Sequence, residues 1–174
     1  MIGLDHRLER WVVEHRAEPF DTLFVALSHL GSYGFIWLTL AVLGVFVWRR
    51  PVVFPLVVIA YFTSAAVTDV IKLAVDRTRP LDHPLVSQPA SHSFPSGHAA
   101  TSFACAATLA PFAPRHAKPV LYVLASAIAY SRVYVGVHYP LDVLGGAALG
   151  LLVAIALRRL PAALRRSRRV QRAG

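Results

Sequence analysis

The stretch Ser131-Arg132-Val133-Tyr134-Val135-Gly136-Val137-His138-Tyr139-Pro140-Leu141-Asp142 places a cation, an imidazole and a carboxylate inside an otherwise apolar sequence. Such groups are costly in hydrocarbon, and within membrane segments they tend to be functional. We therefore expect the chain to fold so that these three groups face the interior of a helical protein rather than lipid.

The spacing within this stretch predicts a nucleophile beside an orienting group. Pro140 suits the first turn of a helix, where its missing N–H is not needed. His138 and Asp142 lie four residues apart, so both can face one side of that helix start. If the carboxylate holds Nδ1–H, the other nitrogen of His138 keeps a free lone pair, as in covalent catalysis. Arg132 adds a planar cation suited to phosphate. On this stretch alone, a structural His–Asp pair is an equal alternative.

Composition indicates one membrane domain over residues 1–174. The chain is 56% hydrophobic, with a mean hydropathy of +0.53. A net charge of +9 would favour nucleic acid only with a basic face and base-reading or stacking elements, which we do not find. We expect no nucleic-acid partner. Most of the cations instead lie in segments that lack Asp and Glu: Arg49, Arg50, Arg115, Lys118, Arg158, Arg159, Arg165, Arg166, Arg168, Arg169 and Arg172.

The apolar runs predict an all-α integral membrane helical bundle with about five to six transmembrane helices. The predicted spans are residues 33–48, 52–75, 99–113, 120–134 and 141–157. Residues 1–20 predict an interfacial helix, because Leu4, Leu8, Trp11 and Val12 share one face; a solvated cap helix is an equal alternative. His29, Gly31 and Gly34 predict a bend or a helix start before the first span. Residues 158–174 predict a basic cytoplasmic tail that frays beyond the membrane.

The predicted spans also indicate on which side the polar motifs lie. Most runs fall short of the roughly 20 residues that cross a bilayer. They reach full length only by continuing through polar positions, so these should face the bundle interior near one surface. The positive-inside rule then puts the basic loops and the C-terminus in the cytoplasm of a plasma-membrane protein, with the motifs at the extracytoplasmic face. No cleavable signal is expected, because charges arrive too early.

Two turn-backs should bring three distant segments together at that face. The predicted site contains Lys72, Arg79, Ser96, Gly97, His98, Arg132, His138 and Asp142. Three cations around two histidines and one carboxylate fit a phosphate, and the backbone N–H groups at a helix start favour an anion. No metal and no cofactor are expected; a metal site at Asp69 and Asp76 is a minor alternative. Taken singly, Ser96 could be only an N-cap, and Lys72 and Asp76 an exposed ion pair.

These residues resemble a known family signature in three ordered parts. Lys72 is followed by six residues and Arg79-Pro80; Pro95-Ser96-Gly97-His98 comes next; Ser131-Arg132, five residues, His138, three residues and Asp142 complete the set. All three parts match the type 2 phosphatidic acid phosphatase (PAP2) superfamily without substitution, over residues 72–142. Many members have six spans, whereas this chain offers five plus an N-terminal helix.

The resemblance implies a metal-independent reaction through a phosphohistidine. It implies that His138 is the nucleophile, that Asp142 orients it, and that His98 protonates the leaving group and then activates water. The phosphate binders it implies are Lys72, Arg79, Ser96, Gly97 and Arg132.

We therefore expect a membrane lipid phosphatase whose substrate is a polyprenyl diphosphate, a phosphatidylglycerol phosphate or a phosphatidate. Few outer loops are available to recognise a large headgroup, so broad specificity is expected. One alternative is a phosphotransferase that passes the phosphoryl group to a lipid or sugar hydroxyl. Another is a lipid-binding or transport protein with a vestigial site, against which the complete motifs argue. The membrane character argues against a soluble haloperoxidase.

Overall fold

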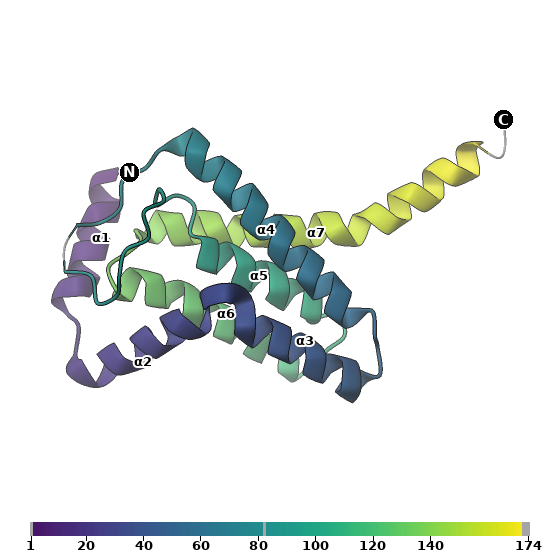
Figure 1. The fold of residues 1–174 in the computed structure, drawn as a ribbon, viewed down its shortest axis with the longest axis horizontal. Helices are drawn as coiled ribbons and strands as arrows, with labels where there is room; N and C mark the ends of the chain where they lie inside the picture. Colours follow the sequence, from purple (N-terminus) through teal and green to yellow (C-terminus); the bar gives the residue numbers. More distant parts are fainter. Residues whose placement is uncertain (1, 82, 172–174) are drawn as a thin grey trace.

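Helix α5 (Gly97–Leu109) runs through the middle of the protein, and the other long helices surround it (Figure 1). The structure, a computed structural model, describes residues 2–81 and 83–171, which contain helices and connections but no strand. The remaining helices are α1 (Ile2–Glu14), α2 (Glu18–Leu30), the short 3₁₀ helix η1 (Ser32–Gly34), α3 (Phe35–Trp48), α4 (Val53–Val75), α6 (Ala117–Tyr134) and α7 (Pro140–Gln171). The predicted all-α class is confirmed.

Small side chains allow α5 to occupy the centre. Its sequence is rich in Ala, Ser and Thr, and nearly all of it is buried against α4, α6 and α7. The indole N–H of Trp37 on α3 donates to the Ser102 hydroxyl across 3.1 Å, which satisfies both polar groups inside the core.

Helices α5 and α7 touch through backbone rather than through side chains. Gly146 and Gly150 lie one turn apart on α7, and a Cβ at either would collide with the carbonyl oxygen of Ser96 or Ala100. Such close approach through small residues is a common way for helices to associate in membranes. It lets the Ser96 amide donate to the Asp142 carbonyl across 2.9 Å. The starts of α5 and α7, which carry two of the three motifs, are therefore fixed side by side.

The predicted bend before the first span is confirmed. Helices α2 and α3 meet at 62° across η1, where Tyr33 and Gly34 have positive φ. A side chain at Gly34 would collide with the Tyr61 ring. At this bend a Cβ on Gly31 would collide with Ile128 of α6 and His98 of α5, so the end of α2 packs closely against both helices.

The two ends of the chain differ from the sequence-based predictions. The expected fraying from residue 158 is wrong in the described range, because α7 continues as a helix to Gln171. Residues 172–174 lie outside the described residues. At the N-terminus, one helix over residues 1–20 is also wrong: α1 ends at Glu14, and α2 begins with Pro19 in its first turn, after an extended Ala17.

Helix α1 packs with its acidic face inward. Asp5 and Glu9 are each only 2% exposed, whereas Leu4, Leu8 and Trp11 are about half exposed. An outward apolar face is compatible with a helix that contacts lipid. The interfacial location of α1 stays a prediction.

The bundle presents an apolar exterior to its surroundings. Large exposed side chains include Phe46, Phe62, Leu73, Val123 and Leu152. Within the described part of the chain, α4 and residues 140–159 of α7 are long and apolar enough to cross a membrane alone, and the bent α2–α3 pair would be a third span if counted as one. These features agree with a membrane fold; the count of five to six spans stays a prediction.

The α5–α7 contact gives a first testable prediction. Gly150→Ala places a methyl group against the backbone of α5 and should lower the free energy of unfolding by about 1–3 kcal/mol, because a tightly packed contact must open. Thermal unfolding in detergent measures the change. Gly3→Ala is the matched control, since a Cβ there meets nothing within 4 Å. Equal melting temperatures for the two variants would contradict the contact.

Candidate active site

The three predicted segments meet at one end of the bundle, where the connection between α4 and α5 covers the starts of α5 and α7 (Figure 1). Six of the eight predicted site residues are at most 9% exposed: Lys72, Arg79, Ser96, Arg132, His138 and Asp142. Gly97 and His98 are partly exposed at the start of α5. These polar side chains are thus buried within the bundle.

His138 lies in the tight connection between α6 and α7. Its backbone N–H and that of Val137 both donate to the Arg132 carbonyl across 3.2 Å, and Gly136 supplies the positive φ that the turn requires. The side chain is 2% exposed. Burial lowers the pKa of the His138 imidazole to about 3, because the cation would lose its hydration. The ring is therefore neutral at physiological pH.

The neighbours of His138 settle which ring nitrogen carries the proton. Nε2 lies 3.1 Å from Nη1 of Arg79, and Nδ1 lies 3.4 Å from Oδ2 of Asp142. A guanidinium can only donate, so Nε2 must accept and the proton must be on Nδ1. The lone pair of Nε2 thus faces the cations, as a nucleophile toward phosphorus requires.

Asp142 has no exposed surface, and both of its oxygens are engaged. Oδ2 accepts from the Tyr139 backbone N–H across 2.9 Å. Oδ1 accepts from Nη1 of Arg77 across 2.6 Å, and Nη2 of Arg77 donates to Asp5 across 2.6 Å. Sequence reasoning missed Arg77 and Asp5. The only available signal was one more cation between Lys72 and Arg79, because Asp5 looked like an ordinary surface acid of a short helix.

Backbone carbonyl groups hold two of the predicted phosphate binders, Lys72 and Arg79. Lys72 donates to the His92 carbonyl across 2.6 Å, so the alternative of an exposed Lys72–Asp76 pair is wrong. Arg79 donates to the carbonyls of Ser91 and Val137 across 2.7 and 2.8 Å. Burial lowers the pKa of the Arg79 guanidinium, which still remains a cation. These cations are held by neutral acceptors.

Two buried polar atoms of the predicted set have no partner within the protein. They are the Ser96 hydroxyl oxygen and Nε of Arg132. Ser96 is the residue before α5, yet its side chain makes no capping bond, so the alternative that it is only an N-cap is not supported. A buried donor without a partner is costly. Both atoms are groups that a bound oxyanion would satisfy.

His98 is held by the bend between α2 and α3, which sequence reasoning did not connect with the site. Its Nε2 lies 3.2 Å from the Ser32 hydroxyl, and Arg132 donates through Nη1 to the Ser28 hydroxyl. Two serines at a bend within a membrane segment were the signal that could have indicated this role.

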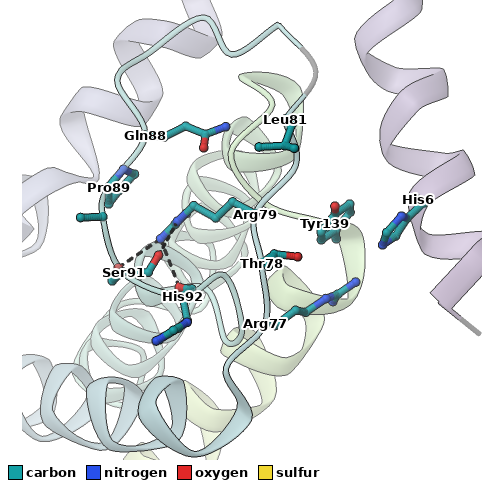
Figure 2. A pocket seen from close by; sticks show the side chains of 11 residues that line it. His6, Arg77, Thr78, Arg79, Leu81, Gln88, Pro89, Ser91, His92 and Tyr139 are labelled. Carbon is teal, nitrogen blue, oxygen red and sulfur yellow. Dashed lines mark hydrogen bonds between the residues drawn. The ribbon is translucent and has the colours of Figure 1, made fainter.

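Two cavities approach the site from different sides. One, of about 610 Å³, is lined by Arg77, Arg79, Ser91, His92 and Tyr139, among others (Figure 2). The other, of about 590 Å³, is lined by residues that include Ser28, Ser32, His98 and Arg132. Pro89 lines both, so the segment around it borders the two cavities.

The minor alternative of a metal site at Asp69 and Asp76 gains no support. In residues 2–81 and 83–171, no group of three or more His, Cys, Asp or Glu side chains could hold a metal ion. Asp76 instead lies 2.8 Å from Nδ1 of His92. His92 therefore contacts the site through its backbone carbonyl, which accepts from Lys72, while its ring pairs with Asp76.

Comparison with known proteins agrees with the geometry. Residues 52–166 match the family model of the PAP2 superfamily. Phosphatidylglycerophosphatase B of Bacillus subtilis is 30% identical over 94% of this chain and 86% of its own length. Decaprenylphosphoryl-5-phosphoribose phosphatase of Mycobacterium tuberculosis is 42% identical over 73% of this chain and 72% of its own length.

A solved structure shares the fold as well. The crystal structure of the transmembrane PAP2-type phosphatidylglycerolphosphate phosphatase from Bacillus subtilis superposes with a TM-score of 0.76 at 29% identity, covering 92% of this chain and 86% of that one. The fold is that of an integral membrane lipid phosphatase of the PAP2 type. The chain belongs to the PAP2 superfamily.

The buried imidazole predicts a pH-dependent part of the stability. The pKa of His138 is about 3 in the folded chain and about 6.5 when unfolded. Between these two pH values the unfolded state therefore binds more protons than the folded state. The free energy of unfolding accordingly decreases as the pH falls from about 6.5 toward 3. His138→Gln removes the contribution, so its melting temperature should fall less than that of the wild type between about pH 7.5 and 5.

His116→Gln is the control for this measurement, because His116 is an exposed histidine in the turn before α6. It should keep the wild-type pH dependence. Parallel curves for wild type and His138→Gln would contradict a neutral buried His138.

Proposed function

We propose that this lipid phosphatase works through a covalent phosphohistidine on His138, oriented by Asp142. The observation that carries the proposal is the donation from Arg79 to Nε2, which leaves Nδ1–H facing Asp142. In the first step Nε2 forms a bond to phosphorus, and the bond from phosphorus to the leaving oxygen breaks. The ring becomes cationic, and the buried carboxylate stabilises it while holding Nδ1–H.

The surrounding donors bind the phosphoryl oxygens. The Ser96 hydroxyl and Nε of Arg132 lack partners, and the first N–H groups of α5 at Gly97 add a helix N-terminus. Lys72 and Arg79 supply two further positive charges. Donors that are fixed before the substrate arrives stabilise the charge of the pentacoordinate transition state without reorganisation.

His98 is the proton donor and acceptor in this proposal. It lines the second cavity together with Arg132, whereas Arg79 lines the first. In the complex with substrate, where the negative phosphoryl group favours the imidazolium, His98 gives its proton to the leaving oxygen. The neutral ring then takes a proton from water as the water oxygen attacks phosphorus and the P–N bond breaks, which releases phosphate and restores His138.

The substrates we propose are lipid phosphates whose tails stay in the bilayer: a phosphatidylglycerol phosphate, a phosphatidate or a polyprenyl diphosphate. The two relatives are named for a glycerophospholipid phosphate and a prenyl-linked phosphoribose. Relatives with different headgroups support a site that recognises the phosphoryl group more than its carrier.

We also propose that the site faces the extracytoplasmic side, with the C-terminus in the cytoplasm. The basic turns at Arg49–Arg50 and Arg115–Lys118 lie at the end of the bundle away from the motif connection (Figure 1), and such turns favour the cytoplasm. Five to six spans and an interfacial α1 complete this arrangement.

Phosphate release by detergent-purified protein in EDTA tests the chemistry. Wild type should release phosphate from at least one of the three lipid classes. His138→Asn should lose activity by on the order of 10³-fold or more, because asparagine retains a donor for Asp142 but lacks the nucleophilic nitrogen. The exposed His116→Asn is the control. Residual activity above a tenth of wild type would contradict the mechanism. Phosphate transfer only when a lipid alcohol is added would indicate the phosphotransferase.

Cysteine labelling of intact cells tests the orientation. The single native cysteine, Cys105, is buried, so Cys105→Ala gives a cysteine-free background. A membrane-impermeant maleimide should label Ser87→Cys in the connection between α4 and α5. It should spare His116→Cys until the cells are opened. The reverse pattern would contradict the proposed orientation.

A further inference from the structure

Asp5 makes contacts that a surface acid does not need. It belongs to the first turns of α1 and is only 2% exposed. Oδ2 binds Nη2 of Arg77 across 2.6 Å, and Oδ1 accepts from the Leu141 backbone N–H across 2.9 Å. One carboxylate thus joins α1 to the α4–α5 connection and to the first turn of α7.

The guanidinium of Arg77 bridges two carboxylates. Nη1 binds Asp142 and Nη2 binds Asp5, each across 2.6 Å. Although Arg77 lines the first cavity, its terminal nitrogens are thus engaged, whereas Arg79 reaches Nε2 of His138. The two neighbouring arginines therefore differ: Arg79 faces the nucleophile, and Arg77 holds the carboxylate that orients it.

A third contact from α1 reaches the residue beside the nucleophile. The rings of His6 and Tyr139 stack at 4.3 Å and 3°, and the guanidinium carbon of Arg77 lies 4.3 Å from the Tyr139 ring centroid. Figure 2 shows His6 projecting from α1 toward Tyr139, with Arg77 nearby. The Tyr139 N–H also binds Oδ2 of Asp142. Helix α1 therefore contacts the His138–Asp142 segment at Tyr139 and at Leu141, and through Arg77.

From these contacts we propose that Asp5 and Arg77 are positioning residues of the reaction, and that α1 is part of the catalytic machinery. The inference rests on the proposed roles of His138 and Asp142. Arg77 fixes Oδ1, so that Oδ2 stays directed at Tyr139 and His138. The contact between His138 and Asp142 is loose, at 3.4 Å. Without Arg77, this contact would be left as the side-chain contact that fixes the plane of the Asp142 carboxylate.

Asp5 has an electrostatic role as well. An Arg77–Asp142 pair alone has no net charge, so it would weakly stabilise the cation that forms on His138 during phosphorylation. Asp5 brings the three groups to a net charge of −1. His138 therefore still faces a net negative charge although Arg77 binds Asp142 firmly. Burial makes the attraction between this charge and the His138 cation stronger than it would be in water.

The test is a charge series with a compensating double variant. Asp5→Asn leaves a net charge of zero and should lower kcat by on the order of 10-fold, with KM within about twofold, since no phosphate contact is removed. Arg77→Gln leaves two buried carboxylates unpaired by a cation and should lower kcat further. Arg77→Lys keeps the charge and should recover part of the loss.

The double variant Asp5→Asn/Arg77→Gln restores the net charge of −1. It should have a higher kcat than Arg77→Gln alone, whereas purely structural damage would accumulate. Glu14→Gln, which removes an exposed carboxylate from the same helix, is the matched control and should equal wild type. Melting temperature and elution volume show that each variant is folded.

Two results would overturn the proposal: an Asp5→Asn kcat within twofold of wild type, or a double variant whose loss equals the product of the single losses. If Arg77→Gln does not fold, Asp5→Asn and Arg77→Lys still decide the question. His138→Asn is measured alongside. Its inactivity together with unaffected Asp5 and Arg77 variants would reject this inference alone, whereas an active His138→Asn would reject the proposed function.

Discussion

Burial of the Asp142 carboxylate is the constraint on which the rest of this site depends. A carboxylate with no exposed surface is stable only if other groups replace its hydration. Here the replacements come from a backbone N–H at Tyr139, from Arg77 and from His138. The backbone carbonyl of the same residue binds the Ser96 amide. Satisfying one residue therefore draws together the start of α7, the start of α5 and the connection after α4, which carry the three motifs.

The cations at the site raise the opposite problem. Lys72 and Arg79 are buried against backbone carbonyls, and Arg132 against a serine hydroxyl. Neutral acceptors satisfy hydrogen bonds but leave positive charge uncompensated. The group of Asp5, Arg77 and Asp142 carries a net charge of only −1, which compensates part of it. The fold thus keeps an excess of positive charge at His138, the proposed nucleophile, and an anion with several oxygens is the ligand that would neutralise it.

The sequence predicted those parts of the structure that depend on local spacing. The His138–Asp142 pair follows from four-residue spacing after a helix-starting proline, and the bend follows from Gly31 and Gly34. Local spacing did not predict the roles of Ser28, Ser32, Asp5 and Arg77, because these roles depend on which helices pack together. The orientation of α1 shows the reason. An apolar face suggests a buried face only when water lies outside. In α1 the face that packs inward is the polar one: Asp5 and Glu9 are buried, whereas Leu4, Leu8 and Trp11 are exposed.

The contact between Arg79 and His138 has a consequence for how a substrate reaches the nucleophile. The proposed attack of Nε2 on phosphorus requires a free lone pair, so an oxygen of the arriving phosphoryl group must replace Nε2 as the acceptor of one Nη1 hydrogen of Arg79. The structure makes this exchange inexpensive. Arg79 keeps its bonds to the carbonyls of Ser91 and Val137, so it gives up only one weak interaction and gains a charged partner. The segment that supplies Ser91 is itself anchored, since Ser93 binds the Arg77 carbonyl across 2.7 Å. The same arginine can therefore hold the neutral tautomer of His138 before binding and stabilise the phosphoryl oxygens afterwards, with its backbone contacts unchanged.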